Sequence, residues 1–86
     1  MKATEYFLNF AAHKHPEVRQ VWIESVLEQP LKVQQQDNGR ISYWGNIPDF
    51  ENRVLRVITL EDGETVHNAF FDRNFYRRQQ RGEEPS

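Results

Sequence analysis

The second half of the chain alternates polar and apolar residues in short runs, and strong turn signals separate these runs. Asp37-Asn38-Gly39 favours a hairpin turn, because Asn-Gly tolerates positive φ, and Glu61-Asp62-Gly63-Glu64 is a second turn signal. Runs of period two that are joined by such turns pair with their neighbours in antiparallel order. The sequence therefore predicts a four-stranded antiparallel meander whose strands span residues 31–36, 40–47, 53–60 and 65–71.

The first thirty residues carry helical spacing instead. Between Thr4 and Lys14 the apolar residues recur at helical intervals, and Thr4 is an N-cap candidate. A second stripe begins after Pro16, which suits the first position of a helix, and it ends before Pro30. The stripe consists of Val18, Val21, Trp22, Ser25 and Val26, and Ile23 and Leu27 widen it.

Two N-terminal helices followed by a four-stranded antiparallel meander predict an α+β fold in which both helices pack on one face of the sheet. The opposite face is expected to be open to solvent or to a partner. The 86 residues have room for one small domain, expected over residues 1–75. Because the chain becomes strongly charged beyond Asp72, residues 76–86 are expected to form a disordered tail.

The composition excludes several function classes. The chain has no cysteine, so a disulfide framework, a thiolate metal site and a cysteine nucleophile are all excluded. No apolar run has the length of a secretory signal or a membrane span, so a cytoplasmic protein without membrane contact is expected. The net charge of −2 argues against a generic polyanion binder. A local basic face is still allowed, since the second half contains Arg40, Arg53, Arg56, Arg73, Arg77, Arg78 and Arg81.

Several short motifs follow one another between residues 13 and 75. A histidine precedes the second helix, and the later motifs are Val26-Leu27-Glu28-Gln29-Pro30, Gly39-Arg40, Tyr43-Trp44-Gly45, Arg53-Val54-Leu55-Arg56-Val57 and Val66-His67-Asn68-Ala69. In this order they resemble small bacterial and phage-associated domains of the BECR superfamily, which joins barnase, EndoU, colicins and RelE. The resemblance implies a toxin-like protein that binds RNA or cleaves it without metal on the exposed sheet face, with an antitoxin as a partner. The acidic net charge departs from the basic character of RelE-type toxins.

RNA cleavage of this kind needs a base for the 2′-hydroxyl proton, an acid for the leaving oxygen and a cation for the charged intermediate. His15 and His67 are the candidate acid and base. Arg40, Arg53 and Arg56 are the candidate phosphate clamps, because the planar guanidinium can hold two phosphoryl oxygens at once. No cofactor or metal is expected, since the spacing of the chain's histidines is not that of a zinc site.

Each histidine also has a purely structural interpretation. His15 stands beside Pro16, where it would end one helix or cap the next. His67 would be a hydrogen-bonded sheet residue that shares a face with Thr65, Ala69 and Phe71.

The central arginine and tryptophan have structural alternatives as well. Arg56 interrupts an apolar strand face, so it needs a partner or an opening to water, and the partner is either a carboxylate such as Asp72 or Glu64 or a ligand. An exposed Trp44 suits stacking on an RNA base or a protein interface equally, and a buried Trp44 packs under the segment that contains Phe75.

The alternative function is a noncatalytic interaction module. An open sheet face or an edge strand can pair with a second copy of the chain, giving a homodimer, or with another protein.

Overall fold

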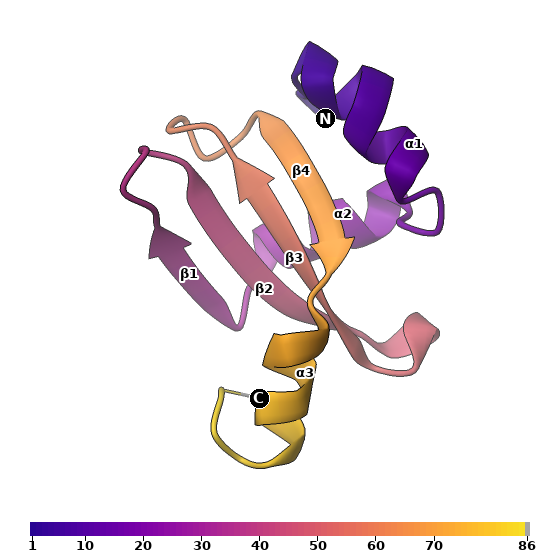
Figure 1. Cartoon of the computed structure of the whole chain (residues 1–86), viewed down its shortest axis with the longest axis vertical. Helices are drawn as coiled ribbons and strands as arrows, with labels where there is room; N and C mark the ends of the chain where they lie inside the picture. Colours follow the sequence, from indigo (N-terminus) through magenta and orange to yellow (C-terminus); the bar gives the residue numbers. More distant parts are fainter. Residues whose placement is uncertain (86) are drawn as a thin grey trace.

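The computed structural model describes residues 1–85, and its centre is an antiparallel sheet in the strand order β1-β2-β3-β4 (Figure 1). The predicted meander is confirmed, and each strand is at most two residues shorter than expected. The strands are β1 (Lys32–Gln35), β2 (Ile41–Ile47), β3 (Arg53–Thr59) and β4 (Val66–Phe71).

Both predicted hairpin turns form for local chemical reasons. Gly39 and Gly63 have φ of 87° and 70°, values that favour glycine. The Asp62 carboxylate accepts hydrogen bonds from the Thr65 hydroxyl, the Thr65 amide and the Glu64 amide. These bonds stabilise the carboxylate and lower the pKa of Asp62 to about 2.

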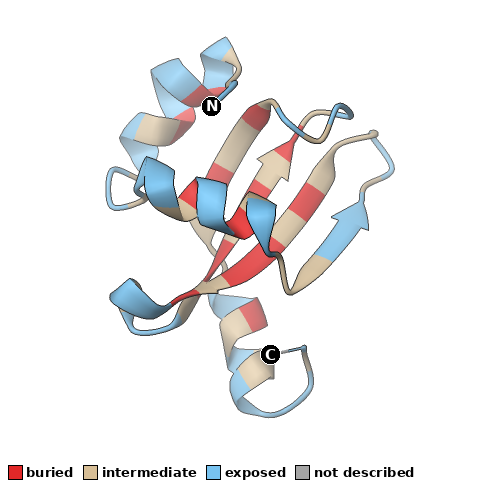
Figure 2. Ribbon diagram, turned by 180° about the vertical axis from the view of Figure 1, so that it is seen from behind, coloured by how far each residue is buried: buried red, intermediate tan, exposed pale blue. Residues whose placement is uncertain are grey.

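One face of the sheet is covered by helix α2 (Gln20–Glu28), which lies behind the sheet in Figure 1 and in front of it in Figure 2. The helix can approach β2 closely because Gly45 has no side chain. A Cβ at this position would lie 3.0 Å from Cγ2 of Val26. The core between the N-terminal helices and the sheet consists of Phe7, Ala11, Ile23, Val26, Ile47, Leu55, Val57, Val66 and Ala69.

The first helical segment comprises the π-helix η1 (Phe7–Ala11) and the short helix α1 (Ala12–Lys14). Thr4 caps it as predicted, because its Oγ1 accepts a hydrogen bond of 3.1 Å from the Phe7 amide. Ala3 also bridges Val66, so the N-terminal segment lies along the outer edge of β4.

The boundary predicted for the second helix was wrong, whereas most of its predicted apolar stripe packs toward the core. The helix starts at Gln20 rather than at Pro16, since residues 16 and 17 form a turn. Its buried side is centred on Ile23 and Val26, with Trp22 and Leu27 packed beside them, whereas Val21 and Ser25 of the predicted stripe are exposed.

The prediction of a disordered tail from residue 76 was also wrong, because residues 73–80 form a third helix, α3 (Arg73–Gln80). Asp72 caps it by accepting a hydrogen bond of 2.9 Å from the Phe75 amide. Phe75 is fully buried and stacks on Trp44, with 5.5 Å between the ring centroids. The fold is α+β, but the helices are not all N-terminal: α3 covers the lower end of the face that α2 leaves free (Figure 1).

The connection between β2 and β3 contains a short 3-10 turn, η2 (Pro48–Phe50). No helix formed by residues 1–85 is both long enough and apolar enough to cross a membrane.

Candidate functional site

The strand register aligns four side chains across the sheet on the face opposite α2. Lys32 pairs with Trp44, Trp44 with Arg56, and Arg56 with Phe70, one residue from each strand. Alternate residues of a strand share a face, so the next row on this face, toward the hairpin end of the sheet, includes Ser42, Ile58 and Asn68. We call this surface the open face, and it comprises Arg40, Ser42, Arg56, Ile58, Asn68 and Phe70.

Arg56 lies between two aromatic rings at the centre of the open face. Its Cζ atom is 4.9 Å from the ring centroid of Trp44 and 5.7 Å from that of Phe70. Nε and Nη2 donate hydrogen bonds of 3.2 and 3.0 Å to Oγ of Ser42. The guanidinium is thus held in place by two rings and a neutral hydroxyl, and none of these groups balances its charge.

Neither predicted carboxylate partner of Arg56 reaches it. Asp72 accepts hydrogen bonds from Nε1 of Trp44 and from the amide of Phe75, at 3.0 and 2.9 Å. Glu64 instead pairs with Lys2 at 3.4 Å. Within residues 1–85, Arg56 forms no ion pair. A partly buried cation without an acid is suited to an anion that arrives from outside the chain.

Trp44 is only 6% exposed, and the interpretation that packs it beneath the C-terminal segment is the one that holds. Its ring is stacked against Phe75, and Nζ of Lys32 lies 5.5 Å from its centroid. Trp44 is therefore not available for stacking on a base. Its ring instead packs against the guanidinium of Arg56. The aromatic ring that the open face offers to a ligand is that of the partly exposed Phe70.

His67 occupies a β-bulge, which breaks the alternation that the sequence predicts for it. Thr59 pairs with Val66 and Ile58 with Asn68, so His67 has no partner of its own in the register. Its Nδ1 lies 3.1 Å from Oγ1 of Thr4, and its ring stacks on Tyr6 with 4.9 Å between centroids. The hydrogen-bonded histidine that the structural interpretation describes is therefore present, with its partners in the N-terminal segment.

The electrostatic surroundings of His67 favour its neutral form. Burial, and to a smaller extent the positive charge of Arg40, lower the pKa of His67 below its usual value. Arg40 directly precedes β2 and lies on the same face as Ser42 by alternation. A neutral imidazole and a cation thus lie at the same end of the sheet, on strands that β3 separates.

The two candidate catalytic histidines do not meet. His15 ends α1 and contacts Phe70, at 6.2 Å between ring centroids, and its Nδ1 lies 3.7 Å from Glu17. Phe70 and His67 are three residues apart on β4, which is about 10 Å along an extended strand. The arrangement therefore offers no acid and base pair around one phosphate.

Arg53 also lies away from the centre of the open face. It pairs with Glu51 at 3.1 Å, and its Cζ atom is 5.9 Å from the ring centroid of Tyr76. Arg53 and His15 instead line the same hollow, together with Arg73. Of the predicted residues, the structure brings Arg56 into contact with Trp44, places Arg40 near His67, and groups His15 with Arg53.

Ser42 and Phe70 hold or border Arg56, but the sequence did not identify them as site residues. A signal existed for Ser42, since it lies between Arg40 and Trp44 on the polar face of its strand. Phe70 had no comparable signal, because its proximity to Arg56 depends on the register of β3 with β4.

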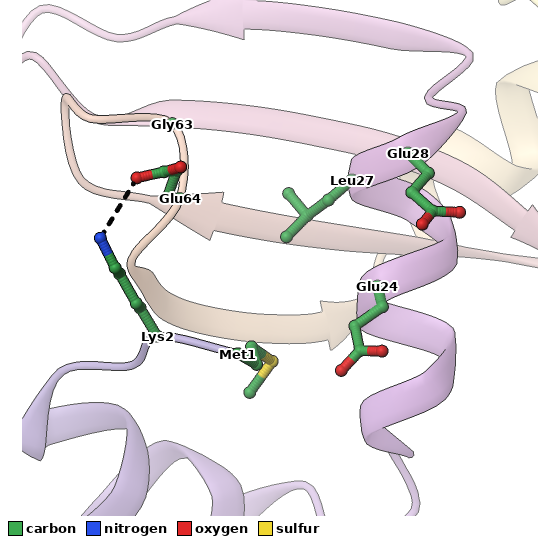
Figure 3. A pocket seen from close by; sticks show the side chains of 7 residues that line it. All are labelled: Met1, Lys2, Glu24, Leu27, Glu28, Gly63 and Glu64. Carbon is green, nitrogen blue, oxygen red and sulfur yellow. Dashed lines mark hydrogen bonds and ion pairs between the residues drawn. The ribbon is translucent and has the colours of Figure 1, made fainter.

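A hollow of about 540 Å³ lies elsewhere, between α2, the N-terminal residues and the turn before β4 (Figure 3). Its carboxylates are Glu24, Glu28 and Glu64, and the Lys2–Glu64 ion pair spans its rim. An acidic hollow disfavours anionic ligands. Among residues 1–85, moreover, no group of three or more His, Asp or Glu side chains is arranged to hold a metal ion.

The environment of His67 gives a direct prediction. In NMR pH titrations, the His67 pKa should lie below about 6.5, and Arg40→Gln should raise it by removing one of the two causes of the shift. Arg81→Gln is the matched control, because Arg81 is exposed and pairs with Glu83 at 2.7 Å. Since the folded chain disfavours protonated His67, stability from this group should be lost as pH falls from about 6.5 through the lower folded pKa. A His67 pKa above the usual value would contradict this description.

Comparisons with protein-family models, with curated proteins and with solved structures found no match for this chain.

Proposed function

We propose that this chain binds single-stranded RNA through the open face, with Arg56 holding a phosphate. The observation that carries the proposal is a partly buried arginine that has two aromatic neighbours and no acid. Guanidinium carries five N–H donors, and the two hydrogen bonds to Ser42 leave three for phosphate oxygens. Phe70 offers a ring for base stacking, and Asn68 offers an amide beside it.

The acidic net charge does not exclude this proposal, because several of the acids lie away from Arg56. Glu24, Glu28 and Glu64 line the hollow beside α2, and Glu84 is engaged by Lys32 and Arg78. A sheet face that carries a ring and arginines fits an unpaired strand, whose bases are free to stack.

Fluorescence anisotropy with a labelled single-stranded RNA of about eight nucleotides tests the proposal. We expect binding that weakens with salt, with a logarithmic slope of about −1.4 to −2.1 for two or three phosphate contacts. A duplex of the same sequence is the control and should bind more weakly, because its bases cannot reach Phe70. Absence of binding, or an affinity that salt does not change, would overturn the proposal.

RNA cleavage is a second candidate function, and the surroundings of His67 favour it. If Nδ1–H donates to Oγ1 of Thr4, Nε2 keeps its lone pair and can take a proton from a ribose 2′-hydroxyl. The 2′-oxygen then attacks phosphorus and the bond to the 5′-oxygen breaks, which leaves a 2′,3′-cyclic phosphate. Arg40 would stabilise the charge on the phosphoryl oxygens, and water would protonate the leaving oxygen.

Incubation with end-labelled RNA in the presence of EDTA tests the cleavage step. Wild-type protein should yield fragments with cyclic phosphate ends, and His67→Ala should abolish them while binding persists. If wild-type protein leaves the RNA intact, or if His67→Ala cleaves as well as wild type, cleavage by His67 is excluded.

The alternative is a protein-interaction module, and the outer edge of β1 favours it. No strand formed by residues 1–85 pairs with this edge, and Val33 beside it is 52% exposed. A second copy of the chain or a protein such as an antitoxin would extend the sheet there. Light scattering over a wide concentration range measures the molar mass and so distinguishes a dimer from a monomer. A dimer that Val33→Lys dissociates supports self-association through this edge, and a strict monomer excludes it.

A further inference from the structure

A second hollow opens where α1, the end of β4 and the start of α3 meet. Its volume of about 370 Å³ is at the lower end of the range for small-ligand sites. We call it the β4–α3 hollow, and the lining residues that matter here are His15, Phe50, Arg53, Phe70 and Arg73.

The cation of this hollow that lacks an acid is Arg73. Within residues 1–85 it forms no ion pair, whereas Arg53 pairs with Glu51, and the carboxylate of the lining residue Glu17 lies 3.7 Å from His15. Arg73 is the first residue of α3, and the positive end of a helix dipole favours an anion over a cation. An exposed cation at this position would be stabilised by a bound anion.

The cationic lining continues beyond the hollow. A neighbouring hollow of about 350 Å³ shares Phe70, Phe71 and Arg73 with it and adds Arg77. Arg73 and Arg77 stand one helical turn apart, a like-charge spacing that is unfavourable without an anion between the two side chains. The acid of this second hollow is Asp72, whose oxygens are already used by Trp44 and the Phe75 amide.

Aromatic rings stand beside these cations. His15 and Phe70 lie 6.2 Å apart at 38°, and Phe50 and Phe71 are stacked at 4.6 Å. Phe70 also borders Arg56 on the open face, at 5.7 Å from its Cζ atom. One ring therefore belongs to both surfaces, and a ligand that crosses it can occupy both.

We propose that the β4–α3 hollow binds one nucleotide of the RNA strand that the open face holds, an inference that rests on the proposed function. Arg73 and Arg53 bind the phosphate, and the base lies against the ring of Phe70 next to His15. Phosphate binding and ring stacking together select a nucleotide over free phosphate or a nucleoside.

NMR titration of ¹⁵N-labelled protein with AMP tests the hollow on its own, with adenosine and inorganic phosphate as separate probes. AMP should shift the amide signals of His15, Arg53, Phe70 and Arg73, and adenosine should bind about tenfold more weakly. Arg73→Gln should weaken AMP binding by about tenfold, and Arg81→Gln should leave it unchanged. If millimolar AMP causes no shifts, or shifts centred on Ser42, the hollow is not a nucleotide site.

The same variants separate this inference from the proposed function. Arg73→Gln should also weaken binding of the labelled RNA, by about three- to tenfold. RNA binding that depends on Arg56 but not on Arg73 would overturn the hollow alone. Failure of the wild-type protein to bind RNA would overturn the proposed function, and the AMP titration would still decide whether the hollow binds a nucleotide.

Discussion

Replacing Phe75 by alanine is expected to lower the free energy of unfolding by about 3–5 kcal/mol, the usual cost of removing a buried phenylalanine ring. The side chain is fully buried, and it holds α3 against the sheet through its stacking on Trp44. Chemical denaturation followed by tryptophan fluorescence measures the change, and Trp44 reports on the same contact.

Phe10→Ala is the matched control for Phe75→Ala. The Phe10 side chain is 62% exposed, so its removal should change the free energy of unfolding by less than about 0.5 kcal/mol. Equal small effects of the two variants would mean that α3 is not part of the folded domain.

Arg56→Gln should weaken RNA binding by about 10- to 100-fold, because charge-assisted hydrogen bonds contribute about 1.5–3 kcal/mol. Glutamine can still donate to Ser42, but it carries no charge and has only two N–H donors. The RNA affinity of Arg56→Lys should lie between those of wild type and Arg56→Gln, since an ammonium group keeps the charge but lacks the planar fork. Anisotropy measurements at one salt concentration compare all three proteins.

Arg81→Gln controls for loss of charge alone, because it removes one exposed arginine that already has an acidic partner. Its affinity for RNA should stay within about twofold of wild type. Thermal unfolding of Arg56→Gln should show a folded protein of slightly lower stability, since no acid is left unpaired but two cation–π contacts are lost. An unchanged RNA affinity in Arg56→Gln would refute the role of this residue in the open face.

The meander was predictable because its signals are local. Asn38-Gly39 and Asp62-Gly63 form turns through their own backbone and side-chain chemistry, and alternation then sets the strand faces. Helix α3 has one local signal, the N-cap residue Asp72, but Arg77 and Arg78 give its segment the composition of a disordered tail. Its stability depends on a ring contact with Trp44, which lies far away in the sequence.

The candidate site was predictable only in part, for a related reason. The position of Arg56 within an apolar strand showed that it needs a partner, but Asp72 and an external ligand were both plausible from the sequence. In the structure, Asp72 caps α3 and accepts a hydrogen bond from Trp44. The sequence alone does not show that these two groups, and not Arg56, are its partners. The bulge at His67 likewise depends on how β3 and β4 pair, so strand parity alone did not show that this residue lacks a partner in the register.

The most direct test of the central claim is an NMR titration of ¹⁵N-labelled protein with single-stranded RNA of about eight nucleotides. If the open face binds the strand, the largest shifts should fall on the amides of Ser42, Arg56 and Phe70, and Arg56→Gln should reduce them together. Shifts that cluster on the outer surface of α2 around Glu24 and Glu28, or no shifts at all, would contradict the claim.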